Sequence, residues 1–169
     1  QSSREEHIIG GINFDYMNLG TDLVEWGRHD ARGFKDYSLL NSQYDPVEGY
    51  WEWAYTKMIR QSNLILDNLK NPELAMSEEA KRNFSGQAKF FRAYTYNVLV
   101  NLYGGVPIVE NQIMEPKFDF KRASKLEVLQ FIRKDLEEAA AELEAMQDVS
   151  NGRVYKAAAS HLLSEVYIS

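Results

Sequence analysis

The residues in this sequence that are best suited to hold a ligand lie in one irregular stretch, residues 20–48. A sugar is held by an aromatic ring that stacks on its apolar face and by charged or amide groups that bind its hydroxyls. The stretch supplies all of these types: Asp22, Trp26, Arg28, Asp30, Tyr37, Asn41 and Tyr44. Loops longer than about 15 residues in a compact domain are usually functional or disordered, and the aromatic content argues against disorder. We therefore expect ligand contacts here, the alternative being that the stretch only covers helix ends.

Catalytic and metal-binding chemistry has little support in the sequence. The chain has no cysteine, which excludes thiolate ligands and a cysteine nucleophile. His7, His29 and His161 are far apart and belong to no metal or catalytic-triad motif. The acids of residues 137–144 lie on a helix whose other face is apolar, so a solvated face explains them better than a glycosidase pair. We expect no catalytic residue, no metal site and no cofactor.

Length and composition indicate a globular domain. The 169 residues are enough for one domain with its own core, and the net charge of −6 disfavours a nucleic-acid partner. No apolar run approaches the roughly 20 residues of a membrane span. The chain begins without Met, shows no signal peptide and ends without a helix stop signal. We interpret it as a piece of a longer polypeptide.

Hydrophobic periodicity predicts an all-α fold with no convincing strand pair. Residues 1–19 resemble the end of a helix, and four amphipathic helices are expected after the irregular stretch, at 50–70, 77–103, 124–146 and 153–169. Ser77 is a good N-cap, Ser124 and Glu127 match a capping box, and Gly104-Gly105 is a stop signal. Consecutive helices joined by short turns predict two hairpins in a tetratricopeptide-like α-α superhelix, although the helices are longer than the 34-residue repeat allows.

The helix at 77–103 is so rich in apolar residues that neighbours should cover it on several sides. Its spacing places Phe90, Phe91, Tyr94, Leu99 and Tyr103 in the core. Arg92 lies inside this apolar helix, and we expect it to pair with a carboxylate or a carbonyl, because a buried unpaired charge is very costly. Trp51 is likewise expected in the core, with Trp53 on another face of its helix.

Four stretches share an order and spacing with a known family. They are Trp51-x3-Tyr55-x3-Ile59-x3-Asn63-x-Ile65-Leu66; Gln87-Ala88-Lys89-Phe90-Phe91-Arg92-Ala93-Tyr94-x-Tyr96-x2-Leu99-Val100-x2-Tyr103-Gly104-Gly105-Val106-Pro107; Arg122-Ala123-Ser124 with Val128, Ile132, Asp135, Leu136 and Ala139; and Gly152-Arg153-Val154 with Ala157-Ala158, Leu162-Leu163 and Val166-Tyr167. Together they resemble the SusD/RagB family of outer-membrane nutrient-binding lipoproteins of Bacteroidota. The second stretch is the most specific, and its one departure is Gln87, where the family usually has Glu.

The resemblance implies a chain about three times as long, of which residues 1–169 form the N-terminal tetratricopeptide-like part, without the C-terminal half and the lipidated N-terminal Cys. It implies a cell-surface protein of the outer membrane that binds glycans or other nutrients and delivers them to a TonB-dependent, SusC-like transporter. Such a protein has no catalytic activity and needs no cofactor. Its ligand contacts come partly from loops in this N-terminal region, while covering the transporter is another role for the loop.

A second hypothesis is a tetratricopeptide-like scaffold that binds a protein partner through its helices. The two hypotheses differ in where exposed aromatic residues should lie. Nutrient capture places them beside the loop at 20–48, and a scaffold places them along a helical groove.

Overall fold

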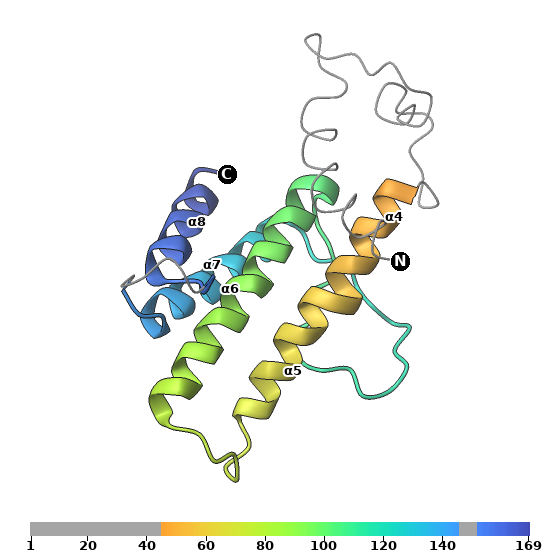
Figure 1. The fold of residues 1–169 in the computed structure, drawn as a ribbon. Coiled ribbons are helices and arrows are strands. Elements are labelled where there is room, and N and C mark those ends of the chain that lie inside the picture. The colour runs from red at the N-terminus through yellow and green to blue at the C-terminus, as the bar shows by residue number, and fades with distance from the viewer. Residues whose placement is uncertain (1–44, 146–151) are drawn as a thin grey trace. The chain divides into compact units, whose positions relative to one another are not determined.

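The computed structural model describes residues 45–145 and 152–169, and all of the described secondary structure is helical (Figure 1). The helix end expected at 1–19 and nearly all of the irregular stretch lie outside the described residues. The chain divides into two compact units, Gln1–Trp53 and Ala54–Ser169. No helix in the described residues combines the length and the apolarity that crossing a membrane requires.

The described part of the first unit is α4 (Asp45–Glu52) and Trp53. Tyr50 is buried in it and packs edge-on against Trp53, with ring centroids 5.5 Å apart. Trp51 is 38% exposed, so its expected place in the core was wrong. Adjacent helix positions point about 100° apart, and Tyr50 occupies the buried direction here.

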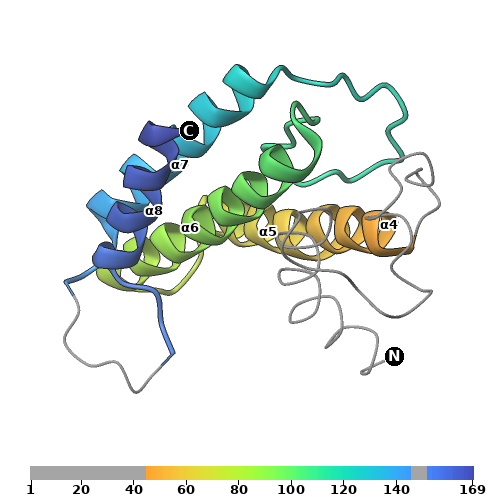
Figure 2. The ribbon, with the colours of Figure 1, turned by 90° about the horizontal axis from the view of Figure 1, so that it is seen from above.

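The described part of the second unit contains five helical segments, the first of which begins at Trp53. The π-helix η4 (Trp53–Ile59) continues into α5 (Arg60–Leu69), and α6 (Glu78–Tyr103), α7 (Lys125–Glu142) and α8 (Lys156–Ile168) follow. In sequence order each of these helices packs on the next, so that α6 lies between α5 and α7 (Figures 1 and 2). This all-α arrangement of tetratricopeptide-like hairpins is the fold class that the sequence predicted.

The expected start and stop signals set the helix ends. The Ser77 hydroxyl accepts a hydrogen bond from the Ala80 N–H, and Ser124 and Glu127 form a complete capping box. Gly104 ends α6 with a φ of 71°, a left-handed conformation that glycine adopts without a Cβ clash. Local capping chemistry therefore explains why the predicted helix boundaries are nearly right.

The core lies between α6 and its neighbours. Tyr96 and Leu99 of α6 are completely buried, as are Val128, Ile132 and Leu136 of α7. The Tyr96 ring meets the Phe131 ring of α7 edge-on, with centroids 5.2 Å apart. A second cluster joins Ala139, Leu143 and Ala159, with Phe90 packed against it.

The prediction that α6 is buried on several sides holds for only part of its surface. Leu99 is buried as expected, whereas Phe91 and Tyr94 are 38% and 39% exposed, so their assignment to the core was wrong. Periodicity marks both rings as apolar, but α5, α7 and α8 pack on the other faces of the helix.

Candidate functional site

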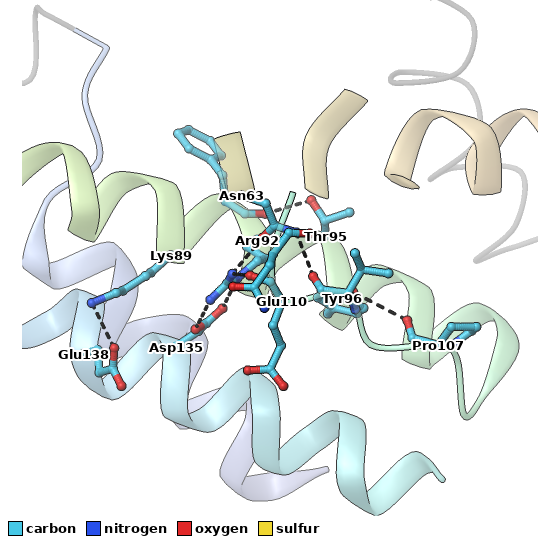
Figure 3. Close-up of polar contacts among 12 residues, drawn as sticks. Asn63, Lys89, Arg92, Thr95, Tyr96, Pro107, Glu110, Asp135 and Glu138 are labelled. Atoms are coloured by element: carbon cyan, nitrogen blue, oxygen red, sulfur yellow. Dashed lines mark hydrogen bonds and ion pairs between the residues drawn. The ribbon is translucent and has the colours of Figure 1, made fainter. Parts of the chain in front are cut away.

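A buried polar cluster centred on Arg92 joins α5, α6 and α7 (Figure 3). The guanidinium Nε and Nη2 donate to the two carboxylate oxygens of Asp135 at 2.7 and 2.8 Å. Arg92 is 7% exposed and Asp135 is 2% exposed, so this bidentate pair is removed from water. The expectation that Arg92 pairs with a carboxylate is confirmed, with a partner 43 residues away along the chain.

The remaining contacts of the cluster hold a segment that follows α6. Arg92 Nη1 donates to Asn63 Oδ1 at 2.7 Å and to the Glu110 carbonyl at 3.0 Å. The Asn63 Nδ2 group donates to the carbonyls of Val109 at 2.8 Å and Asn111 at 3.3 Å. Asn63 is 1% exposed, so its amide is fully committed to positioning this segment.

Two tyrosines and an aspartate complete the attachment of residues 107–112. The Tyr55 hydroxyl donates to the Pro107 carbonyl at 2.6 Å, and the Tyr96 hydroxyl accepts from the Val109 N–H at 2.7 Å. The Asp67 carboxylate accepts from the Gln112 N–H at 2.8 Å. Backbone groups removed from water need partners. Side chains of the helices supply them here, where a sheet would use a neighbouring strand.

Burial and neighbouring charges shift the pKa values of this cluster. Burial raises the pKa of Asp135, and the guanidinium of Arg92 opposes that shift. Burial also raises the pKa of the Tyr55 and Tyr96 hydroxyls far above the ordinary tyrosine value. The hydrogen bond from Lys70 lowers the pKa of Asp67. Both tyrosines are thus kept neutral, so that Tyr55 can donate its proton to the Pro107 carbonyl.

The cluster positions backbone and offers no catalytic group. Nε, Nη1 and Nη2 of Arg92 all donate to groups of the protein, which argues against a role for this side chain in binding a ligand. Its guanidinium also lies over the Phe131 ring, 5.1 Å from the centroid. Within residues 45–145 and 152–169, no group of three or more His, Cys, Asp or Glu side chains could hold a metal ion.

The raised pKa values of Tyr55 and Tyr96 predict that the free energy of unfolding falls at alkaline pH. Above about pH 10 an unfolded chain loses tyrosine protons that the folded chain retains at Tyr55 and Tyr96, so stability should fall as the pH rises. Urea unfolding at a series of alkaline pH values, followed by circular dichroism, should show this loss. The free energy of unfolding should fall less steeply with pH in Tyr55→Phe/Tyr96→Phe than in the wild type. The matched control, Tyr94→Phe, removes a hydroxyl from an exposed ring of α6, and equal slopes in the wild type and the double variant would contradict the prediction.

Comparison with known proteins identifies the framework to which this cluster belongs. A family model for SusD-like proteins, described as "Starch-binding associating with outer membrane", matches residues 27–168. The chain belongs to the SusD-like family. The match covers every helix from α4 to α8 and confirms the family that the four sequence stretches indicated.

Individual SusD-like relatives match nearly the whole chain. SusD-like protein P25 of Formosa agariphila is 29% identical, over 98% of this chain and 33% of its own length. A SusD-like protein from Bacteroides fragilis has the same fold, with a TM-score of 0.78 at 24% identity, over 99% of this chain and 35% of its own. A laminarin-binding SusD-like protein gives a TM-score of 0.76 at 23% identity, with coverages of 99% and 40%. The chain spans about a third of the length of the curated relative.

The ligand contacts expected from the sequence stay predictions for this SusD-like chain. Asp22, Trp26, Arg28, Asp30, Tyr37, Asn41 and Tyr44 all lie outside the described residues.

Sequence reasoning missed the anchoring roles of Tyr55, Asn63, Tyr96 and Asp135. All four lie inside the stretches that resemble the SusD-like family. The available signal was a polar group at helical spacing on an otherwise apolar face, such as Asn63 four residues after Ile59.

Proposed function

We propose that this SusD-like protein captures glycans or other nutrients at the surface of the outer membrane without transforming them. The observation that carries the proposal is the family match, whose description joins starch binding with association to the outer membrane. A relative of the same fold that binds laminarin supports a carbohydrate ligand.

The ligand contacts in this proposal come from the predicted loop at residues 20–48. Its aromatic rings stack on sugar faces, and its carboxylates, amide and guanidinium bind hydroxyls. Loops carried by rigid scaffolds are common sites of binding residues. Within the second unit, the Arg92 cluster fixes α5, α6 and α7 to one another as a rigid framework.

The proposal continues with delivery of the nutrient to a TonB-dependent, SusC-like transporter. The protein would be held at the outer membrane by a lipid anchor outside the printed sequence. Capture needs neither a catalytic residue nor a cofactor, in keeping with the role of the Arg92 cluster in positioning backbone.

Glycan capture predicts saturable binding of at least one polysaccharide. Titration calorimetry against a panel that includes laminarin should detect it, and Trp26→Ala should weaken it about tenfold, because the loss of a stacking ring at a binding hot spot costs more than about 1.4 kcal/mol. Phe84→Ala is the matched control, since it removes an exposed ring from α6, outside the predicted loop. Binding by no member of the panel, or equal binding by Trp26→Ala and the wild type, would count against the proposal.

One observation favours the second candidate, a scaffold that binds a protein. Phe84, Phe91 and Tyr94 are exposed on α6, and Phe90 and Phe91 make an edge-on ring contact there. Exposed aromatic rings on a helix are suited to a protein interface. If Phe91→Ala/Tyr94→Ala leaves polysaccharide binding unchanged, glycan capture and this helical surface are separate properties.

A further inference from the structure

The segment between α6 and α7 exposes an unusual group of apolar side chains. In residues 113–121, called the connector loop below, Phe118 is 94% exposed and Met114 is 80% exposed. Ile113 and Phe120 are 46% and 44% exposed. Large apolar side chains gathered on a surface mark sites that contact another molecule or a membrane. Phe118 is the most exposed large hydrophobic side chain in the described part of the chain.

This exposure does not come from a lack of attachment, because both ends of the connector loop are fixed. Before it, the Asp67 carboxylate accepts a hydrogen bond from the Gln112 N–H, and Asn63 Nδ2 donates one to the Asn111 carbonyl. After it, Arg122 donates to the carbonyls of Tyr103 at 2.7 Å and Gly105 at 2.6 Å. The connector loop therefore stands away from the helices between two anchored ends (Figures 1 and 2).

The charge of this region is opposite to that of the whole chain. The connector loop itself holds two lysines and two acids, and Arg122 and Lys125 directly after it bring residues 113–125 to a net charge of +2, in a chain whose net charge is −6. Lys117 lies over the Phe120 ring, 5.6 Å from its centroid. Lys121 and Lys125 are exposed and make no ion pair with any residue that the structure describes. Lys121 and Lys125 are thus available to meet an anionic surface.

We propose that the connector loop docks directly on an anionic membrane surface. Phe118 and Met114 enter the boundary between the headgroups and the acyl chains, and the lysines contact anionic headgroups. A protein partner fits less well, because protein interfaces are depleted in lysine and involve about 20–30 residues on each side. The proposal does not depend on glycan capture. The polysaccharide titration does not decide whether the loop binds vesicles, and vesicle binding does not decide whether the protein binds a glycan.

A single fluorescent label tests the insertion directly. The chain has no cysteine, so Phe118→Cys provides one site for an NBD fluorophore, and Phe84→Cys on α6 provides the matched control. Vesicles of mixed phosphatidylglycerol and phosphatidylcholine should shift the emission of the label at 118 to shorter wavelength, and high salt should reverse the shift. The label at 84 should not respond.

Vesicle sedimentation of unlabelled protein supplies a second measurement. Met114→Ser/Phe118→Ser should lower the partition coefficient on the anionic vesicles about tenfold, since two inserted apolar side chains are lost, whereas Phe84→Ser should leave it unchanged. Both loop side chains are exposed, so the variant keeps the fold. The proposal is overturned if the label at 118 ignores the vesicles, responds equally to pure phosphatidylcholine, or responds to laminarin in place of vesicles. Unchanged partition of the double variant overturns it as well.

Discussion

Replacement of Arg92 by methionine should lower the free energy of unfolding by about 3–5 kcal/mol, the range measured when one partner of a buried ion pair is removed. The substitution keeps an unbranched side chain but leaves the carboxylate of Asp135, 2% exposed, without its bidentate partner. It also removes the donor that Asn63 Oδ1 and the Glu110 carbonyl share. Urea unfolding followed by circular dichroism measures the loss.

Two further variants decide whether the loss comes from the buried pair. Arg133→Met removes an exposed arginine of α7, whose Nε lies 3.6 Å from Glu137, and should change stability by no more than about 0.5 kcal/mol. Arg92→Met/Asp135→Leu removes both charges and should recover part of the loss, because no unpaired carboxylate stays buried. If Arg92→Met costs no more than Arg133→Met, the cluster does not stabilise the fold as described.

Gly105→Ala should also be strongly destabilising, at the upper end of the roughly 1–3 kcal/mol that overpacking costs. A Cβ atom at Gly105 would lie 2.0 Å from the Ala123 carbonyl oxygen. Both atoms belong to the backbone, so no change of rotamer relieves the clash. The two segments would have to separate, which would weaken the hydrogen bond from the Ala123 N–H to the Val106 carbonyl at 3.2 Å.

Gly152→Ala provides the matched control for this close approach. Gly152 has a φ of 65°, but no atom lies within 4 Å of a Cβ added there. Its substitution should therefore cost only the roughly 1–2 kcal/mol of a left-handed backbone conformation. Thermal unfolding of the two variants compares their losses of stability. A Gly105→Ala variant as stable as Gly152→Ala would show that the backbone at Ala123 does not approach Gly105 as closely as described.

Local signals predicted the helices well because those signals depend on neighbours within one turn. Ser77 caps α6 through the N–H of Ala80, three residues away, and Ser124 and Glu127 satisfy each other's backbone in the same way. Gly104 ends α6 because its own backbone takes a positive φ. None of these interactions needs the rest of the fold, which is why their positions can be predicted from the sequence alone.

The candidate ligand site was predicted only as a set of residue types. Trp26 and Asn41 have the chemistry that a sugar needs, but spacing within an irregular stretch does not bring particular side chains together. The exposed Trp51 shows a related limit, because its apolar character suggested the core while Tyr50 takes the buried position in α4. Hydrophobic periodicity did not single out the connector loop, since the exposure of Phe118 follows from where the ends of the loop are anchored.

The sequence by itself determined the helical class, the helix ends, the family and the need of Arg92 for a partner. Only the tertiary structure decided that the partner is Asp135, and that Asn63 and Tyr96 hold the backbone after α6. It also decided that Phe91 and Tyr94 face outward. The physical reason is that a hydrophobic period shows which side of a helix is apolar, whereas burial and pairing depend on which distant segments pack against that side.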